Sequence, residues 1–167
     1  MENWKRPKLK IPKTKSEWVW DCIGYLNFFG SIIFLIAVWN SLPDQVPAHF
    51  NIQGEVNRYG SKFELLILPG ISLFILLFLQ TFEKFPEMHN YPERLNETNA
   101  AQFYLHSRKL LNQIKNICLI LFALIVYESV SIALGWGYVF GVWFLPVTFA
   151  AIGVSIIRGI VKQRRIK

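Results

Sequence analysis

The stretch LPDQVPAHFNIQGEVNRYGSK, Leu42 to Lys62, is a polar segment enclosed by two apolar runs of membrane-spanning length. Those runs, Cys22 to Trp39 and Leu65 to Phe82, contain no charged residue. Each is close to the ~20 residues that a helix needs to cross a ~30 Å hydrocarbon core. The segment between them carries acids, bases, amides and a histidine. It is therefore the part of this region best suited to bind a ligand.

The whole chain shares this apolar character. Its 167 residues are 53% hydrophobic and 17% charged, whereas a soluble domain has roughly 25% charged residues. Two further apolar runs follow: Ile117 to Trp136, whose one charge is Glu128, and Gly137 to Ile157, which has none. We therefore predict a single all-α integral membrane domain, residues 1–167. Its four transmembrane helices are expected at about residues 21–40, 63–82, 113–134 and 138–158.

The net charge of +7 is concentrated at the two ends of the chain. Basic residues beside spans mark the cytoplasmic side, so both termini are predicted to be cytoplasmic and segment 41–62 exterior. Anionic lipid headgroups attract such basic clusters, with a binding free energy of ~1 kcal/mol per basic residue. We therefore expect membrane lipids as partners and no nucleic acid. Because Pro7 and Pro12 discourage a regular helix, residues 1–20 are expected to form a disordered or surface-lying tail.

Turn and helix signals refine the two longer connections. In the exterior segment, Gly54 separates two loosely alternating stretches, which predicts a small hairpin, a short extended pair around a glycine turn. The cytoplasmic connection, 83–112, begins irregularly with two prolines, and Asn96 is then a good helix N-cap. From Ala100 onward, apolar residues recur at three- and four-residue steps. We predict one helix from about residue 97 that continues into the third span.

Glu128 is the most informative single residue of the spans. A carboxylate near mid-membrane costs a few kcal/mol and usually faces a bundle interior or a cavity. Counting from Ile117 at ~1.5 Å per residue places Glu128 about 17 Å into its span, on the side of the exterior segment. His49, Arg58 or Lys62 could pair with it if that segment folds into the bundle mouth. The alternative is a protonated or hydrogen-bonded glutamate that only packs helices.

Ligand contacts are expected from Glu128 and polar side chains of the exterior segment, namely His49, Asn51, Glu55, Arg58, Tyr59 and Lys62. His49 and Glu55 are the secondary candidates for metal ligands, with Asp44 or Glu128 as a third. They flank the predicted turn and no HExxH pattern occurs, so we expect no metal and no cofactor. No familiar catalytic pattern appears either. Whether the chain is an enzyme stays open, with a non-enzyme favoured. The catalytic alternative is a His49–Glu128 pair that serves as general base and as the group that orients it.

The exterior segment also resembles a known family. The residues that carry the resemblance are Leu42-Pro43, Pro47-Ala48-His49-Phe50-Asn51, Gly54 and Tyr59-Gly60-Ser61-Lys62. They are similar to the signature of a bacterial membrane family of unknown function, DUF family 1648, which also forms the N-terminal part of SdpI-type toxin-immunity proteins. A second stretch, from Asn90-Tyr91-Pro92 to Gln102-Phe103-Tyr104, resembles a motif of its short members. Together the matches span about residues 40–110.

The resemblance implies a multi-pass protein of a bacterial cell membrane. It also implies immunity to a secreted peptide toxin, or signalling through capture of a cytoplasmic repressor. Our leading hypothesis is an SdpI-like protein whose exterior segment recognises a peptide or lipid-associated ligand. The alternatives are a membrane-embedded enzyme, metal-dependent in one version, that uses His49, Glu55 and Glu128, and an accessory subunit of a transporter. Expected partners are a peptide toxin or another membrane protein, with a homo-oligomer left open.

Overall fold

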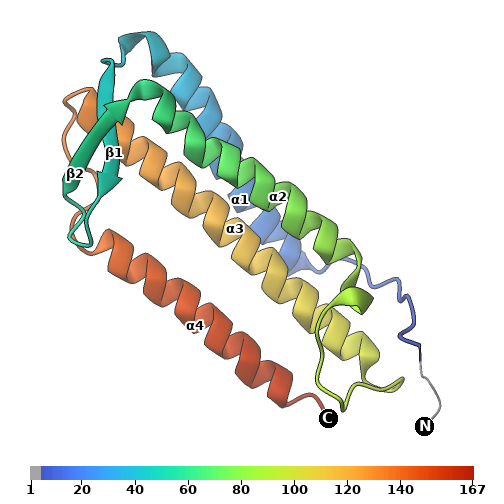
Figure 1. The fold of residues 1–167 in the computed structure, drawn as a ribbon. Helices are drawn as coiled ribbons and strands as arrows, with labels where there is room; N and C mark the ends of the chain where they lie inside the picture. Colours follow the sequence, from blue (N-terminus) through green and yellow to red (C-terminus); the bar gives the residue numbers. More distant parts are fainter. Residues whose placement is uncertain (1–4) are drawn as a thin grey trace.

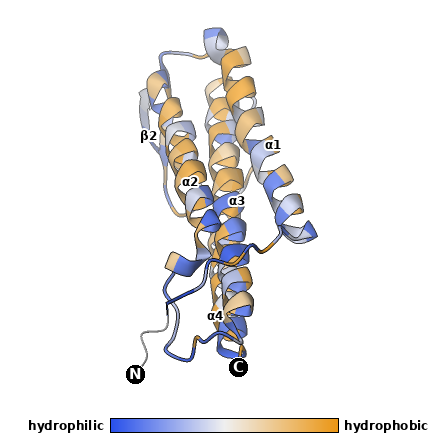
Figure 2. Cartoon of the chain, turned by 90° about the vertical axis from the view of Figure 1, so that its right-hand side faces the viewer, coloured by the Kyte–Doolittle hydropathy of each residue, from blue (hydrophilic) through white to orange (hydrophobic). Residues whose placement is uncertain are grey.

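The computed structural model describes residues 5–167, in which four long helices run back and forth along one axis (Figure 1). All four are long and apolar enough to cross a membrane, so the chain is a multi-pass membrane protein, as predicted. Hydropathy colouring shows the apolar residues along the middle of the helices and polar residues near their ends (Figure 2). The helices are α1 (Lys15–Val38), α2 (Ile67–Lys84), α3 (Ala100–Ala133) and α4 (Phe144–Arg164).

Helix α3 is the centre of the molecule. It packs against α1 and α2 along its length, and it also contacts α4 and the hairpin. Helices α1 and α2 touch each other much less. Leu119, Val126 and Val130 of α3 are fully buried, whereas most apolar side chains of α2 and α4 are exposed. That outward apolar surface suits lipid, which is as apolar as leucine.

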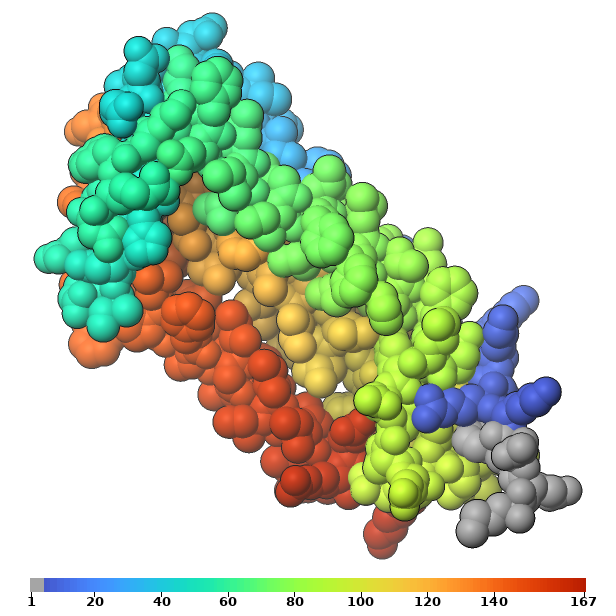
Figure 3. All heavy atoms as spheres, in the orientation of Figure 1, coloured from blue at the N-terminus to red at the C-terminus, as the bar shows by residue number. Residues whose placement is uncertain are grey.

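Helix α4 is separated from α2 and touches α3 at fewer points than α1 and α2 do. Beyond Phe144, its contacts with α3 include the bond from Gln113 Nε2 to Ser155 Oγ (3.2 Å) and the bond between His106 and the Gly159 carbonyl (2.8 Å). The space-filling view shows a groove between α2 and α4, with α3 as its floor (Figure 3). The two walls of this groove therefore touch α3 but hardly each other.

The polar segment between α1 and α2 forms an antiparallel hairpin of β1 (Gln45–Phe50) and β2 (Val56–Ser61). The extended pair expected around Gly54 is therefore present, with Gly54 at a φ of 80° in the turn. Val46 of β1 is completely buried and anchors the hairpin to the helices. It belongs to an apolar cluster with Leu35, Leu42, Leu65, Val126 and Val130. We call this end of the molecule the hairpin end.

The opposite end, which we call the tail end, holds the first described residues, the C-terminus and the connection between α2 and α3. Residues 5–14 lie along this end, and Arg6 donates to the carbonyls of Glu87 (3.2 Å) and His89 (2.7 Å). The tail was expected to reach residue 20, but α1 already begins at Lys15. Glu17 explains the difference, because its carboxylate accepts from the backbone N–H (2.8 Å) and hydroxyl (2.7 Å) of Thr14. The first four residues lie outside the described part.

The other three helices begin later than expected. Helix α2 starts at Ile67 instead of 63, because residues Lys62–Leu66 form a 3-10 helix. Helix α3 starts at Ala100 instead of about 97, because Asn96 Oδ1 accepts from the N–H groups of Thr98 (2.9 Å) and Asn99 (3.3 Å) and closes a separate turn. Helix α4 starts at Phe144 instead of 138. The preceding loop contains Gly135 and Gly137 at φ values of 73° and 91°, which residues other than glycine rarely adopt.

Candidate functional site

A pocket of about 300 Å³ lies under the hairpin, where β1, the start of α2, α3 and the start of α4 meet. We call it the hairpin pocket. Its walls are mostly apolar, formed by Pro47, Ala48, Phe50, Leu65, Ile67, Leu68, Ile125, Phe140, Phe144 and Leu145. Its polar side chains are His49, Arg58, Glu64, Glu128 and Ser129. Of the seven residues predicted to bind a ligand, the structure thus brings His49, Arg58 and Glu128 to one pocket.

Glu128 closes the inner side of this pocket and is only 5% exposed. Its Oε2 accepts from the backbone N–H groups of Val139 (3.0 Å) and Phe140 (3.2 Å) in the loop before α4. The pairing with His49, Arg58 or Lys62 that the sequence left possible is not present in residues 5–167. Arg58 instead pairs with Glu64, and His49 with Asn57.

Arg58 and Glu64 form a bidentate ion pair at the rim of the hairpin pocket. Arg58 Nη2 lies 2.7 Å from Glu64 Oε2, and Nη1 lies 3.2 Å from Oε1. Hydrogen bonding to Glu64 raises the pKa of Arg58 above its ordinary value. Gly60 leaves room for this pair, since a Cβ there would lie 2.1 Å from Glu64 Oε1. Glu64 was missed in the sequence, although it follows Arg58 closely across the junction between β2 and α2.

His49 is the hairpin's titratable group at the pocket. Its Nδ1 lies 2.6 Å from Asn57 Oδ1 on the neighbouring strand. In the tautomer in which Nδ1 donates to this carbonyl oxygen, Nε2 of the ring is an acceptor. His49 can therefore accept a hydrogen bond from a hydroxyl or amine of a ligand.

The other predicted ligand contacts lie away from the pocket. Asn51 and Glu55 build the turn: Asn51 Oδ1 accepts from the N–H groups of Gln53 (3.0 Å) and Glu55 (2.9 Å), and its Nδ2 donates to Glu55 Oε2 (2.9 Å). Tyr59 is exposed, and Lys62 lies 3.9 Å from Asp44. No three His, Cys, Asp or Glu side chains of residues 5–167 are placed to hold a metal ion. His49, Glu55 and Glu128 thus do not form the metal site that one alternative required.

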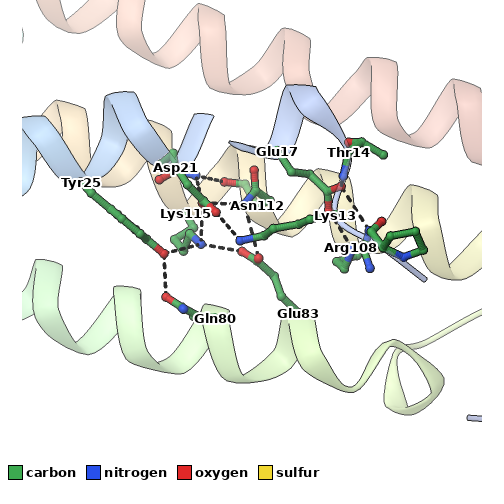
Figure 4. Close-up of polar contacts among 12 residues, drawn as sticks. Lys13, Thr14, Glu17, Asp21, Tyr25, Gln80, Glu83, Arg108, Asn112 and Lys115 are labelled. Atoms are coloured by element: carbon green, nitrogen blue, oxygen red, sulfur yellow. Dashed lines mark hydrogen bonds and ion pairs between the residues drawn. The ribbon is translucent and has the colours of Figure 1, made fainter. Parts of the chain in front are cut away.

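A second polar site lies between α1, α2 and α3 near the tail end, and it was not predicted (Figure 4). At its centre the ammonium group of Lys115 lies 3.0 Å from Asp21 Oδ1 and 2.8 Å from Glu83 Oε1. Two amides complete it, since Asn112 Nδ2 (2.7 Å) and Asn116 Nδ2 (3.0 Å) both donate to Asp21. We call Asp21, Glu83, Asn112, Lys115 and Asn116 the Lys115 cluster. All five side chains are at least nine-tenths buried.

Charged residues around the cluster tie it to the tail. Arg108 donates to Glu17 Oε1 through Nε (2.8 Å) and to the carbonyls of Ile11 (2.6 Å) and Pro12 (2.9 Å). Lys13, in the same segment, forms an ion pair with Asp21. On the other side, Tyr25 links Lys115 to Gln80 by hydrogen bonds.

The sequence does contain a signal for this site. Arg108, Asn112, Lys115 and Asn116 recur at three- and four-residue steps, and so share one face of α3. Glu17, Asp21 and Tyr25 likewise recur at four-residue steps on α1. Matching polar faces on two neighbouring helices would have predicted the contact.

Comparisons with known proteins place the hairpin in a recognised region. Residues 26–73 match the model of a family described as "Domain of unknown function (DUF1648)". An uncharacterized protein of Archaeoglobus fulgidus is 31% identical over 80 residues, which are 47% of this chain and 42% of that relative. No solved structure matches. Over residues 26–73, from the middle of α1 through the hairpin into α2, this chain is therefore similar to the domain of unknown function DUF1648.

Proposed function

We propose that this protein binds an amphipathic ligand, a peptide or a lipid-associated molecule, in the hairpin pocket. The observation that carries the proposal is the pocket's composition, apolar walls with His49, Arg58 and Glu128 among a few polar side chains. Pockets of about 300–1,000 Å³ with this composition are the usual sites for small ligands. A hydrophobic body fits the walls, and a polar group fits the side that His49 and Arg58 form.

The position of the pocket supports entry from the membrane. Leu68 of α2, Ile125 of α3 and Phe144 of α4 line the pocket, so it is bordered by the same three helices that form the groove between α2 and α4. A ligand dissolved in the bilayer can enter along this groove with its apolar part still in contact with lipid. Its polar group then meets His49 Nε2 as an acceptor and the Arg58–Glu64 pair as donor and acceptor.

Charge placement supports an exterior location for the pocket. The basic residues gather at the tail end, and the positive-inside rule assigns that end to the cytoplasm. The hairpin then faces outward in a bacterial cell membrane. Together with the resemblance to SdpI-type immunity proteins, this favours a membrane-active peptide as the ligand. Immunity would follow if the protein sequesters the peptide, and signalling if α3 transmits its binding to the tail end.

Binding can be tested with a dansyl-labelled amphipathic peptide and the full chain in lipid nanodiscs. We expect His49→Ala and Ile125→Trp, which fills the pocket, each to weaken binding about tenfold, or ~1.4 kcal/mol. Tyr59→Ala is the matched control, because Tyr59 belongs to the same hairpin but is exposed outside the pocket. Survival of peptide-challenged cells that express the same variants tests immunity separately. Unchanged binding by folded His49→Ala and Ile125→Trp proteins would exclude the pocket as the site.

A further inference from the structure

We infer that the Lys115 cluster is a binding site for one small cation, a proton or a monovalent metal ion, and that Lys13 is its built-in occupant. The cluster lies near the tail end, whereas the hairpin pocket lies at the opposite end of the helices. The inference therefore does not depend on the proposed function.

The charges of the cluster are balanced only when Lys13 is present. Asp21 and Glu83 both face Lys115, and Lys13 supplies the second positive charge through its ion pair with Asp21. If Lys13 leaves, two carboxylates share one ammonium group and one negative charge remains. A buried charge without a partner is strongly unfavourable. One monovalent cation restores neutrality, whereas a divalent ion leaves an excess positive charge.

An unpartnered oxygen inside the cluster is suited to a cation. Asn112 is 1% exposed, and its Oδ1 has no hydrogen-bond partner in the described part of the chain. Its Nδ2 bridges Asp21 Oδ1 (2.7 Å) and Glu83 Oε2 (3.3 Å), so the amide lies between the two carboxylates. Buried polar atoms of native proteins nearly always have partners. Carboxylate and amide oxygens together are ligands that suit hard cations.

Lys13 is the member of the network that can be displaced. Its side chain is 27% exposed, whereas that of Lys115 is completely buried. It lies on segment 5–14, outside the four helices, so its departure does not require any helix to unfold. A cavity of about 690 Å³ between this segment and the end of α2 is lined by Lys13, Glu83 and Arg108. Water and ions can therefore approach Glu83 and the ammonium group of Lys13 from the tail end.

The groups that surround Asp21 come from every neighbouring element. They are Lys13 from the tail segment, Glu17 and Tyr25 from α1, Glu83 from α2, and Arg108, Asn112, Lys115 and Asn116 from α3. Arg108 neutralises Glu17, with Nε 2.8 Å from Oε1. Only the charges of Asp21, Glu83, Lys13 and Lys115 therefore enter the balance.

The test measures the thermal unfolding of full-length Lys13→Met over a pH series in choline, sodium and potassium chloride at constant ionic strength. In choline at neutral pH we expect the midpoint to fall by roughly 5 °C or more. Acid restores it if the cation is a proton, and sodium or potassium restores it if the cation is a metal ion. Adding Asp21→Asn should abolish both dependences. Lys10→Met is the control, because Lys10 lines the same cavity without an ion pair in the described residues.

A midpoint of Lys13→Met that is equally low at every pH and in every salt, or equal to that of wild type throughout, would overturn the inference. If Lys13→Met does not fold, the wild type supplies the test, because Lys13 lies 5.2 Å from the ring centroid of Trp18. A cation that displaces Lys13 should change the Trp18 emission, taken as the difference between wild type and Trp18→Phe. An emission difference that does not respond to acid, sodium or potassium would contradict the proposal in that case.

Discussion

Glu128 of α3 binds the loop that leads into α4. Its carboxylate holds the N–H groups of Val139 and Phe140, and α4 follows only at Phe144. The alternatives considered from the sequence were a partner for a hairpin cation and a glutamate that packs helices. The structure supports the hydrogen-bonded form, in which Glu128 joins α3 to the loop before α4 and forms one wall of the hairpin pocket.

Replacing Glu128 should therefore loosen the loop before α4. Glu128→Ala removes the acceptor of two N–H groups, and we expect it to lower the free energy of unfolding by ~1–3 kcal/mol. Glu128→Gln keeps one acceptor oxygen, so its free energy of unfolding should lie between those of Glu128→Ala and wild type. Chemical unfolding in detergent gives the free energy, and faster amide exchange at Val139 and Phe140 would localise the effect. Glu55→Gln on the exposed turn is the control, and equal exchange in Glu128→Ala and wild type would contradict this role.

Tyr91 predicts the behaviour of the tail end at alkaline pH. Burial raises the pKa of Tyr91 to about 12, and its hydroxyl donates to the Pro86 carbonyl (2.8 Å). Because the pKa in the folded protein lies above the ordinary value of ~10, the resulting stability is complete below that value. It is lost as the pH rises towards about 12. Unfolding measured across this range should show an alkaline loss in wild type that is smaller in Tyr91→Phe. The same loss in both proteins would exclude Tyr91 as its source.

Among the elements, α3 shows what the sequence could predict and what it could not. The helix itself follows from apolar residues at three- and four-residue steps, and the hairpin follows from Gly54 between alternating stretches. However, Leu110 and Ile114, in the middle of the predicted apolar face, are only half-buried, whereas Arg108 and Lys115 are buried. Burying these cations is favourable only because Glu17, Asp21 and Glu83 come from other helices, and such partners are visible only once the helices are docked.

The contact between α1 and α3 also depends on a glycine. A Cβ at Gly24 would lie 2.1 Å from Asn116 Oδ1, so the two helices can approach only because Gly24 has no side chain. We expect Gly24→Ala to destabilise the protein by ~1–3 kcal/mol through this overlap. Gly30→Ala on the same helix meets nothing within 4 Å and should be neutral or stabilising. Chemical unfolding of both variants gives the two free energies to compare. The double variant Gly24→Ala/Asn116→Ala should be more stable than Gly24→Ala if the overlap is the cause.

The ion pair between Arg108 and Glu17 allows a second test of how the elements hold together. Arg108→Met leaves Glu17 buried without its partner and should lower the free energy of unfolding by ~3–5 kcal/mol. Glu17→Leu/Arg108→Met removes both charges and should cost less than the single change. Both values come from chemical unfolding of the purified variants. A double variant less stable than Arg108→Met would contradict this expectation. It would show that Glu17 stabilises the fold mainly through its hydrogen bonds with Thr14 and not through Arg108.

At the scale of the whole molecule, the arrangement of the chain predicts which end faces outward. Segment 5–14 and the C-terminus lie at the tail end with the basic clusters, and the hairpin lies at the other end. In a chain without Cys22 and Cys118, we expect Ile52→Cys to react with a membrane-impermeant maleimide in intact cells. Met88→Cys should react only after permeabilisation. Both positions are exposed, so access to the reagent decides the result. The reverse pattern would invert the orientation and place the hairpin pocket inside the cell.

Helix α4 is held by the loop that precedes it and by its second half, from Ser155 onward, and hardly in between. Near the hairpin, Glu128 holds the loop that leads into it, and near the tail, Arg94 donates to the carbonyls of Gln163 (2.7 Å) and Ile166 (3.1 Å). A helix held in this way bends most easily between these two attachments. The width of the groove beside α2 is then set partly by the lateral pressure and thickness of the surrounding bilayer. A change of lipid alone would alter how readily the hairpin pocket opens.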